Sequence, residues 1–361
     1  MRDQYEAARR AALELGDAPE LFPALWGLWI FYLVSGSLIT SQEIAERLLG
    51  IANERGLPEL RSAAHTAYGA SRLYRGFFAD AYIHLRAAAA EYDPERDRGS
   101  ALTYGQDLFV AARGLGAFAA ALLGKADDAL AEAHEGVAWA EHLEHPFTLC
   151  YALEFLELVH ELRGEGEPLA AGAERKLAIA REQAFPFWVA GGLGLLGRAH
   201  TMQGRAEEGC TLAEQGLAAW RATGAELAIT YHLGLLADAL RSAGRIDEAL
   251  MATDEAMRFT TANDEHYWEP QVLHVQAECH LLQGQPIDQV EPLLRQALRV
   301  ARDQGNCFAG LRSARLLVRL LADAGRQAEA TSALTWATEA AREAQIPEGL
   351  RAELESTQLS D

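Results

Sequence analysis

The chain has 361 residues, half of them hydrophobic, and its formal net charge is −20. Nucleic acids and anionic membranes attract basic surfaces, so this charge argues against both as partners. The four scattered cysteines form no CxxC pair, which disfavours a zinc site or a disulfide framework and favours a reducing, cytoplasmic location.

The N-terminal segment predicts a single amphipathic helix within residues 1–18, the remnant of a truncated repeat. It is followed by the apolar run LFPALWGLWIFYLV, residues 21–34. A membrane-spanning helix needs about 20 residues, so the run predicts a buried helix. Its aromatic side chains, Trp26 and Phe31 among them, give the first repeat more apolar surface than the end of a solenoid usually exposes. We therefore expect self-association or partner docking through residues 1–35, unless the run is simply the core of the first repeat.

The strongest signal in the sequence is a glycine that recurs at intervals of 40, 48, 40, 40, 40, 40 and 41 residues. The series comprises Gly36, Gly76, Gly124, Gly164, Gly204, Gly244, Gly284 and Gly325. Glycine readily takes the left-handed conformation that closes a helix before a tight turn. Small or apolar residues follow most of these glycines five, nine and twelve positions later, as Gly209, Ala213 and Gly216 follow Gly204. Steps of four and three place such residues on one helical face, where two helices can pack closely.

This pattern is typical of tetratricopeptide repeats, stretched from their usual ~34 residues to a period near 40. HEAT and armadillo repeats have a similar period but lack the glycine and the small residues after it. The predicted fold is therefore all-α, a right-handed superhelical solenoid of about eight helix-turn-helix repeats in a single domain. We place the eight repeats in residues 20–346, a loop-like insertion at 91–107 and a C-terminal capping helix at 347–361.

Several segments carry a family resemblance: LFPALWGLWIFYLVSGSL, TYGQDLFVAARG, EHPFTLCYALEF, AFPFWVAGGLGLLGRAHTMQGRAEEG and AAWRATGAELAITYHLGLLADALRSAGRIDEAL. They resemble the tetratricopeptide-repeat region at the C-terminus of bacterial signalling ATPases of the class III adenylate cyclase type and of related large transcriptional regulators. The resemblance covers about residues 20–355 and implies a regulatory array that senses a ligand or a partner. Unlike those proteins, this sequence contains neither the ATPase nor the cyclase domain, and it has no GxxxxGK[ST] loop for a nucleotide phosphate.

Two motifs that could hold a cofactor or a metal have simpler explanations. Gly192, Gly194 and Gly197 form a GxGxxG sequence. Dinucleotide binding requires a strand before this motif and a helix that starts within it, whereas here the motif falls inside a predicted helix. The segment EHLEH, residues 141–145, offers two histidines and two glutamates, but it straddles a helix end and no third ligand stands at metal-site spacing. We therefore expect no cofactor and no metal.

The best functional candidates follow from the geometry of such repeats, whose first helices line a concave groove. Positions about 13, 10 and 6 residues before each glycine point into this groove. The candidate groove residues are Tyr151, Glu154, Arg198, Tyr231, Asp238, Gln271, His274, Glu278, Arg312, Arg315 and Arg319. The last three share one helical face and suit a carboxylate or phosphate, although a solvated charged face is the alternative for each.

The sequence thus predicts a non-catalytic binding or regulatory scaffold, which holds a peptide, a protein segment or a small effector in its groove. No Ser–His–Asp or Cys–His arrangement can be assembled from its residues, so no catalytic residue is assigned. The alternative is a free-standing small-molecule-binding protein or enzyme that uses the groove as its ligand site or active site.

Overall fold

The computed structural model describes residues 20–333, 335 and 344–345. The predicted helices at 1–18 and 347–361 lie outside these residues. The described part of the chain is helical, and its one β-pairing is an isolated bridge between Lys125 and Gln345. The predicted all-α fold class is therefore confirmed. No helix in this part has the length and apolar character that a membrane span requires.

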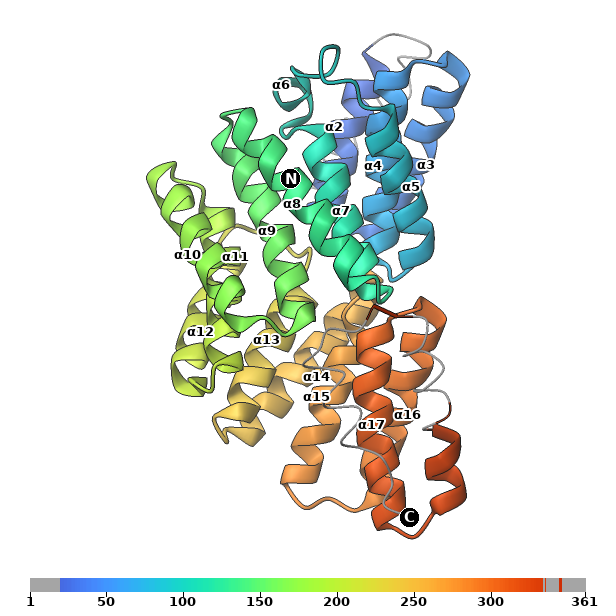
Figure 1. The fold of residues 1–361 in the computed structure, drawn as a ribbon, viewed down its shortest axis with the longest axis vertical. Helices are drawn as coiled ribbons and strands as arrows, with labels where there is room; N and C mark the ends of the chain where they lie inside the picture. Colours follow the sequence, from blue (N-terminus) through green and yellow to red (C-terminus); the bar gives the residue numbers. More distant parts are fainter. Residues whose placement is uncertain (1–19, 334, 336–343, 346–361) are drawn as a thin grey trace.

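Pairs of consecutive helices, each joined at one of the recurring glycines, build the structure (Figure 1). The first helices are α2 (Leu21–Val34), α4 (Pro58–Tyr74), α7 (Leu108–Leu122), α9 (Pro146–Arg163), α11 (Pro186–Met202), α13 (Ile229–Ser242), α15 (Glu269–Leu282) and α17 (Cys307–Asp323). The second helices are α3 (Leu38–Arg55), α5 (Phe78–Glu91), α8 (Ala126–His142), α10 (Gly166–Glu182), α12 (Ala206–Ala222), α14 (Ile246–Asn263) and α16 (Ile287–Gln304). The short helix α6 (Ser100–Tyr104) falls within the predicted insertion.

The recurring glycines close the first helix of each pair, as predicted. All eight have positive φ angles, between 72° and 89°. At Gly244, the amide donates to the Arg241 carbonyl (3.1 Å) and the following Arg245 amide donates to the Leu240 carbonyl (2.9 Å). These two bonds satisfy carbonyl groups at the end of α13 that have no partner within the helix.

The GxGxxG stretch lies within α11 and packs directly against α12. A Cβ atom added to Gly197 would stand 2.9 Å from both the Gly209 carbonyl oxygen and the Ala213 nitrogen. A Cβ atom added to Gly216 would stand 2.7 Å from the Gly194 nitrogen. The two helices approach so closely that only a hydrogen atom fits at these positions. The small residues therefore serve helix packing, as the repeat pattern predicted.

The solenoid curls back on itself, a feature that the sequence did not predict. The turn after α2 meets the loop before α13, where the amides of Glu226 and Leu227 donate to the Val34 carbonyl at 2.9 and 3.0 Å. The turn after α4 makes the equivalent contact one repeat later, through an ion pair of 2.5 Å between Arg75 and Asp264. In Figure 1 the helices α2–α7 accordingly lie above α14–α17.

The N-terminal apolar run forms α2 and is buried, as predicted. Trp29 Nε1 donates to Ser71 Oγ of α4 (3.0 Å), and Trp26 Nε1 donates to the Tyr104 carbonyl of α6 (3.4 Å). Both indoles are at most 3% exposed. The chain's own helices thus cover these side chains, which favours the interpretation of the run as the core of the first repeat. Self-association or partner docking through residues 1–35 remains a prediction.

Candidate functional site

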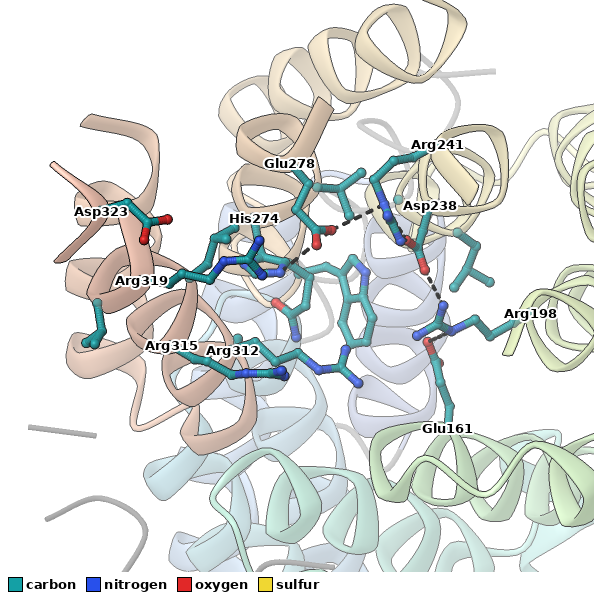
Figure 2. A pocket seen from close by; sticks show the side chains of 18 of the residues that line it. Glu161, Arg198, Asp238, Arg241, His274, Glu278, Arg312, Arg315, Arg319 and Asp323 are labelled. Carbon is teal, nitrogen blue, oxygen red and sulfur yellow. Dashed lines mark hydrogen bonds and ion pairs between the residues drawn. The ribbon is translucent and has the colours of Figure 1, made fainter. Parts of the chain in front are cut away.

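The concave side of the solenoid holds a cavity of about 680 Å³ between α9 and α17. Its wall comes from the first helices of five successive pairs, α9, α11, α13, α15 and α17 (Figure 2). The charged residues on this wall are Glu161, Arg198, Asp238, Arg241, Glu278, Arg312, Arg315, Arg319 and Asp323. We call this cavity the charged groove.

One side of the charged groove is a ladder of alternating charges that crosses four helices. Arg198 of α11 donates through Nε to Glu161 of α9 (3.0 Å) and through Nη1 to Asp238 of α13. Arg241 of α13 donates to Asp238 (2.6 Å) and lies 3.2 Å from Glu278 of α15. Arg198, Asp238 and Glu278 are 40 residues apart, so they occupy the same position in successive repeats. The 40-residue period thus places opposite charges side by side on neighbouring helices.

Burial and the neighbouring guanidinium groups set the protonation of Asp238 in the ladder and of His274 beside it. Burial opposes ionisation of Asp238, but Arg198 and Arg241 outweigh it and lower the pKa of this carboxyl to about 2. Burial also lowers the pKa of His274 to about 3, with a further contribution from Arg312. Asp238 is therefore ionised and His274 is neutral at physiological pH.

The other side of the charged groove is the face of α17 that carries Arg312, Arg315 and Arg319. Asn306 begins this helix, and its side chain accepts a hydrogen bond from the Ala309 amide (3.3 Å). Figure 2 shows the three arginines across the cavity from the ladder. Together the two sides present five guanidinium groups and four carboxylates. The groove is therefore locally positive in a protein whose net charge is −20.

Gln271 of α15 adds a neutral hydrogen-bonding group to the wall of the groove. Neither its Oε1 nor its Nε2 has a hydrogen-bond partner within the described part of the chain. A buried amide without hydrogen-bond partners costs free energy. A peptide bond of a ligand could donate to Oε1 and accept from Nε2 of Gln271. No group of three histidine, cysteine or acidic residues in the described part could hold a metal ion.

No protein-family model matches the chain, and no curated protein matches it in sequence. Solved structures do resemble it. A Rap protein complexed with Competence and Sporulation Factor aligns with a TM-score of 0.67 at 12% sequence identity, over 99% of this chain and 94% of that one. NprR in complex with its cognate peptide NprX aligns with a TM-score of 0.56 at 14% identity, over 81% of each chain.

The chain is a tetratricopeptide-like solenoid. Its neighbours also include a signal transduction ATPase from Pyrococcus horikoshii with a tetratricopeptide repeat sensor (TM-score 0.46, 14% identity, 99% of this chain and 55% of that one). The Rap and NprR structures confirm the tetratricopeptide-like fold expected from the sequence, and identities of 12% and 14% show nothing beyond the fold.

The tetratricopeptide-like geometry brings together eight of the eleven residues that the sequence assigned to the groove. They are Arg198, Asp238, Gln271, His274, Glu278, Arg312, Arg315 and Arg319. The other three, Tyr151, Glu154 and Tyr231, line a separate apolar cavity instead.

Sequence reasoning missed four polar or aromatic residues of the charged groove. They are Glu161, Arg241, Trp268 and Asp323. Glu161 and Arg241 stand three residues before Gly164 and Gly244, one helical turn beyond the assigned positions. Extending the pattern by that turn would have found both.

Proposed function

We propose that this chain is a non-catalytic regulatory scaffold that binds a peptide in the charged groove. The unpartnered amide of Gln271 carries the proposal, because it suits pairing with the backbone of an extended ligand. The volume of about 680 Å³ falls within the range of ligand-binding clefts. The solved structure of NprR with its cognate peptide supports the same use of a similar fold.

The charges of the groove favour a peptide that brings a carboxylate to α17. Guanidinium groups bind carboxylates through two parallel hydrogen bonds. Arg198 and Arg241 already pair with carboxylates of the ladder, whereas Arg319 makes no ion pair within the described chain. A C-terminal carboxylate or an acidic side chain is therefore the expected ligand group at Arg319.

Asp238 and His274 of the groove are poorly suited to general acid–base catalysis. Such catalysis needs a group whose pKa lies near the working pH. The pKa values of Asp238 and His274, about 2 and 3, lie well below that range. These two groups therefore do not serve as general acid or base, although burial raises the pKa of Glu161 and of Glu278 in the same groove.

The experiment is selection from a random library of ten-residue peptides against the full chain, followed by fluorescence polarisation with the enriched sequences. We expect peptides with a free or side-chain carboxylate, whose amidation or replacement by the neutral amide weakens binding about tenfold or more. The variants Gln271→Ala and Arg319→Gln should each weaken binding. Arg299→Gln, which changes an exposed arginine on α16 outside the groove, is the matched control.

Two results would contradict the proposal. The first is a selection that enriches no peptide. The second is a set of peptides that bind the wild type, the Gln271→Ala variant and the Arg319→Gln variant with equal affinity.

A further inference from the structure

A second cavity, of about 250 Å³, lies between the N-terminal repeats and the middle of the chain. It shares no lining residue with the charged groove. Tyr231 and Trp268 stand between the two, with their rings 4.8 Å apart and nearly perpendicular. The wall of the second cavity is mostly aromatic, so we call it the aromatic cavity.

The aromatic cavity lies where the solenoid closes. Val34 from the first repeat and Leu227 from the loop before α13 both line it, and the Leu227 amide donates to the Val34 carbonyl at 3.0 Å. Tyr74 and Tyr267 line it as well, and the Tyr267 amide donates to the Tyr74 carbonyl at 3.3 Å. A molecule in this cavity would contact both sides of the closing junction.

Three phenol groups on the wall have no hydrogen-bond partner among the residues that the structure describes. Tyr74, Tyr151 and Tyr267 line the cavity, and their hydroxyls make no hydrogen bond within the described chain. Tyr267 is 2% exposed, whereas Tyr74 and Tyr151 are partly exposed. In contrast, the Tyr231 hydroxyl donates to Glu161 at 2.5 Å. The three remaining phenols offer donors that need an acceptor.

The single carboxylate on the wall is already neutralised. Glu154 lines the cavity and forms an ion pair with Lys176, which is fully buried. Lys176 also pairs with Glu157, and burial raises the pKa of that carboxyl to about 8, with Lys176 acting against the rise. The Glu154 carboxylate on the wall thus already has its counter-ion in Lys176. A charged ligand would lose its hydration without gaining a counter-ion.

We propose that the aromatic cavity binds a free, compact and uncharged aromatic molecule that carries a hydrogen-bond acceptor such as a carbonyl. A cavity of about 150 Å³ is enough to hold benzene, so this one has room for a ring with a short substituent. Because the ligand contacts both sides of the junction, it stabilises the closed solenoid by mass action. This site is distinct from the peptide-binding function proposed for the charged groove.

The test compares two probes of nearly the same shape, acetophenone and ethylbenzene, on the full chain. Saturation-transfer NMR gives their affinities, and thermal unfolding reports on the closed solenoid. We expect acetophenone to bind a single site about fivefold more tightly than ethylbenzene, because only acetophenone accepts from the phenols. It should also raise the unfolding temperature, whereas benzoate and benzylamine should not bind.

The variants separate the phenol donors from the shape of the cavity. The double variant Tyr74→Phe/Tyr151→Phe keeps the rings and removes two hydroxyls, so the preference for acetophenone should shrink to less than about twofold. Tyr104→Phe is the matched control, since Tyr104 does not line the cavity. Leu158→Trp places a larger side chain into the cavity wall and should abolish binding of both probes.

The proposal is overturned if neither probe binds, if both bind with equal affinity, or if Leu158→Trp leaves binding unchanged in a folded protein. It is also overturned if acetophenone fails to bind and a peptide with an aromatic residue, selected for the charged groove, binds the Leu158→Trp variant more weakly than the wild type. In that case the cavity takes a peptide side chain. Arg319→Gln should weaken peptide binding to the charged groove and leave acetophenone binding unchanged. The two measurements therefore test the peptide proposal and the aromatic-ligand proposal separately.

Discussion

Replacement of Gly216 by alanine tests the close packing of α11 against α12. In an exposed helix, alanine is more favourable than glycine by about 0.5–1 kcal/mol. At Gly216 the added Cβ would stand 2.7 Å from the Gly194 nitrogen and 3.1 Å from the Ala190 carbonyl oxygen. Both neighbours are backbone atoms of α11, so the helices must separate. Overpacking of this kind costs about 1–3 kcal/mol, and we expect Gly216→Ala to lower the free energy of unfolding by about 1–2 kcal/mol.

Gly50→Ala is the matched control for this prediction. Gly50 lies inside α3, and a Cβ atom added to it has no neighbour within 4 Å. This variant should gain about 0.5–1 kcal/mol from helix propensity alone. Urea unfolding followed by circular dichroism at 222 nm measures both. Equal stabilities of the Gly216→Ala and Gly50→Ala variants would refute the inferred approach of α11 and α12.

Three further predictions concern backbone conformation, pH and buried charge. Gly244→Val should lower the free energy of unfolding by about 1–3 kcal/mol, because a β-branched residue resists a φ of +77°. The effect is one of backbone conformation, since the added Cβ would meet no atom within 4 Å. Urea unfolding that matches the wild type would contradict this prediction. Burial raises the pKa of Glu265 from 4.5 to about 7, although the hydrogen bonds to its carboxylate act against this rise. Between these two pH values the folded state binds a proton that the unfolded state has lost. The free energy of unfolding should therefore fall by about 3 kcal/mol as pH rises from below 4.5 to above 7. Glu265→Gln should reduce this pH dependence of the free energy of unfolding, measured by urea titrations at several pH values. An unchanged pH dependence would mean that other groups cause it. Arg198→Met should lower the free energy of unfolding by about 3 kcal/mol at pH 7, because it leaves Glu161 and Asp238 with one fewer counter-charge. A double variant that also carries Glu161→Gln should regain part of this stability. No recovery in the double variant would contradict the pairing of Arg198 with Glu161.

The local architecture could be predicted from the sequence because it depends on short-range rules. Each recurring glycine takes the left-handed conformation within its own turn, and Gly216 packs against the helix immediately before its own. The same period placed Arg198, Asp238 and Glu278 on one wall, since equivalent positions of successive repeats lie side by side. These contacts join residues within one or two repeats, where the pattern is sufficient.

The closure of the solenoid could not be predicted in this way. The contacts of Val34 with Leu227 and of Arg75 with Asp264 join residues about 190 positions apart. Whether such residues meet depends on the small rotation between neighbouring repeats, summed over several of them. A sequence period fixes which face of a helix is buried but not that rotation.

The same limitation explains why Tyr151, Glu154 and Tyr231 lie outside the charged groove. They occupy inward-facing positions, as the repeat pattern predicted, but the closing junction covers the part of the concave surface on which they stand. Closure therefore divides one predicted groove into two cavities of opposite character.

The wall between these cavities links their chemistry. The Tyr231 hydroxyl donates to Glu161, the first member of the charge ladder, and Tyr231 also lines the aromatic cavity. Buried ion pairs contribute little net stability, because desolvation offsets their attraction. The ladder instead holds neighbouring helices in a defined relative position, since each arginine bridges two carboxylates that come from different helices. Through its hydroxyl, Tyr231 thus joins the wall of the aromatic cavity to the first carboxylate of the ladder.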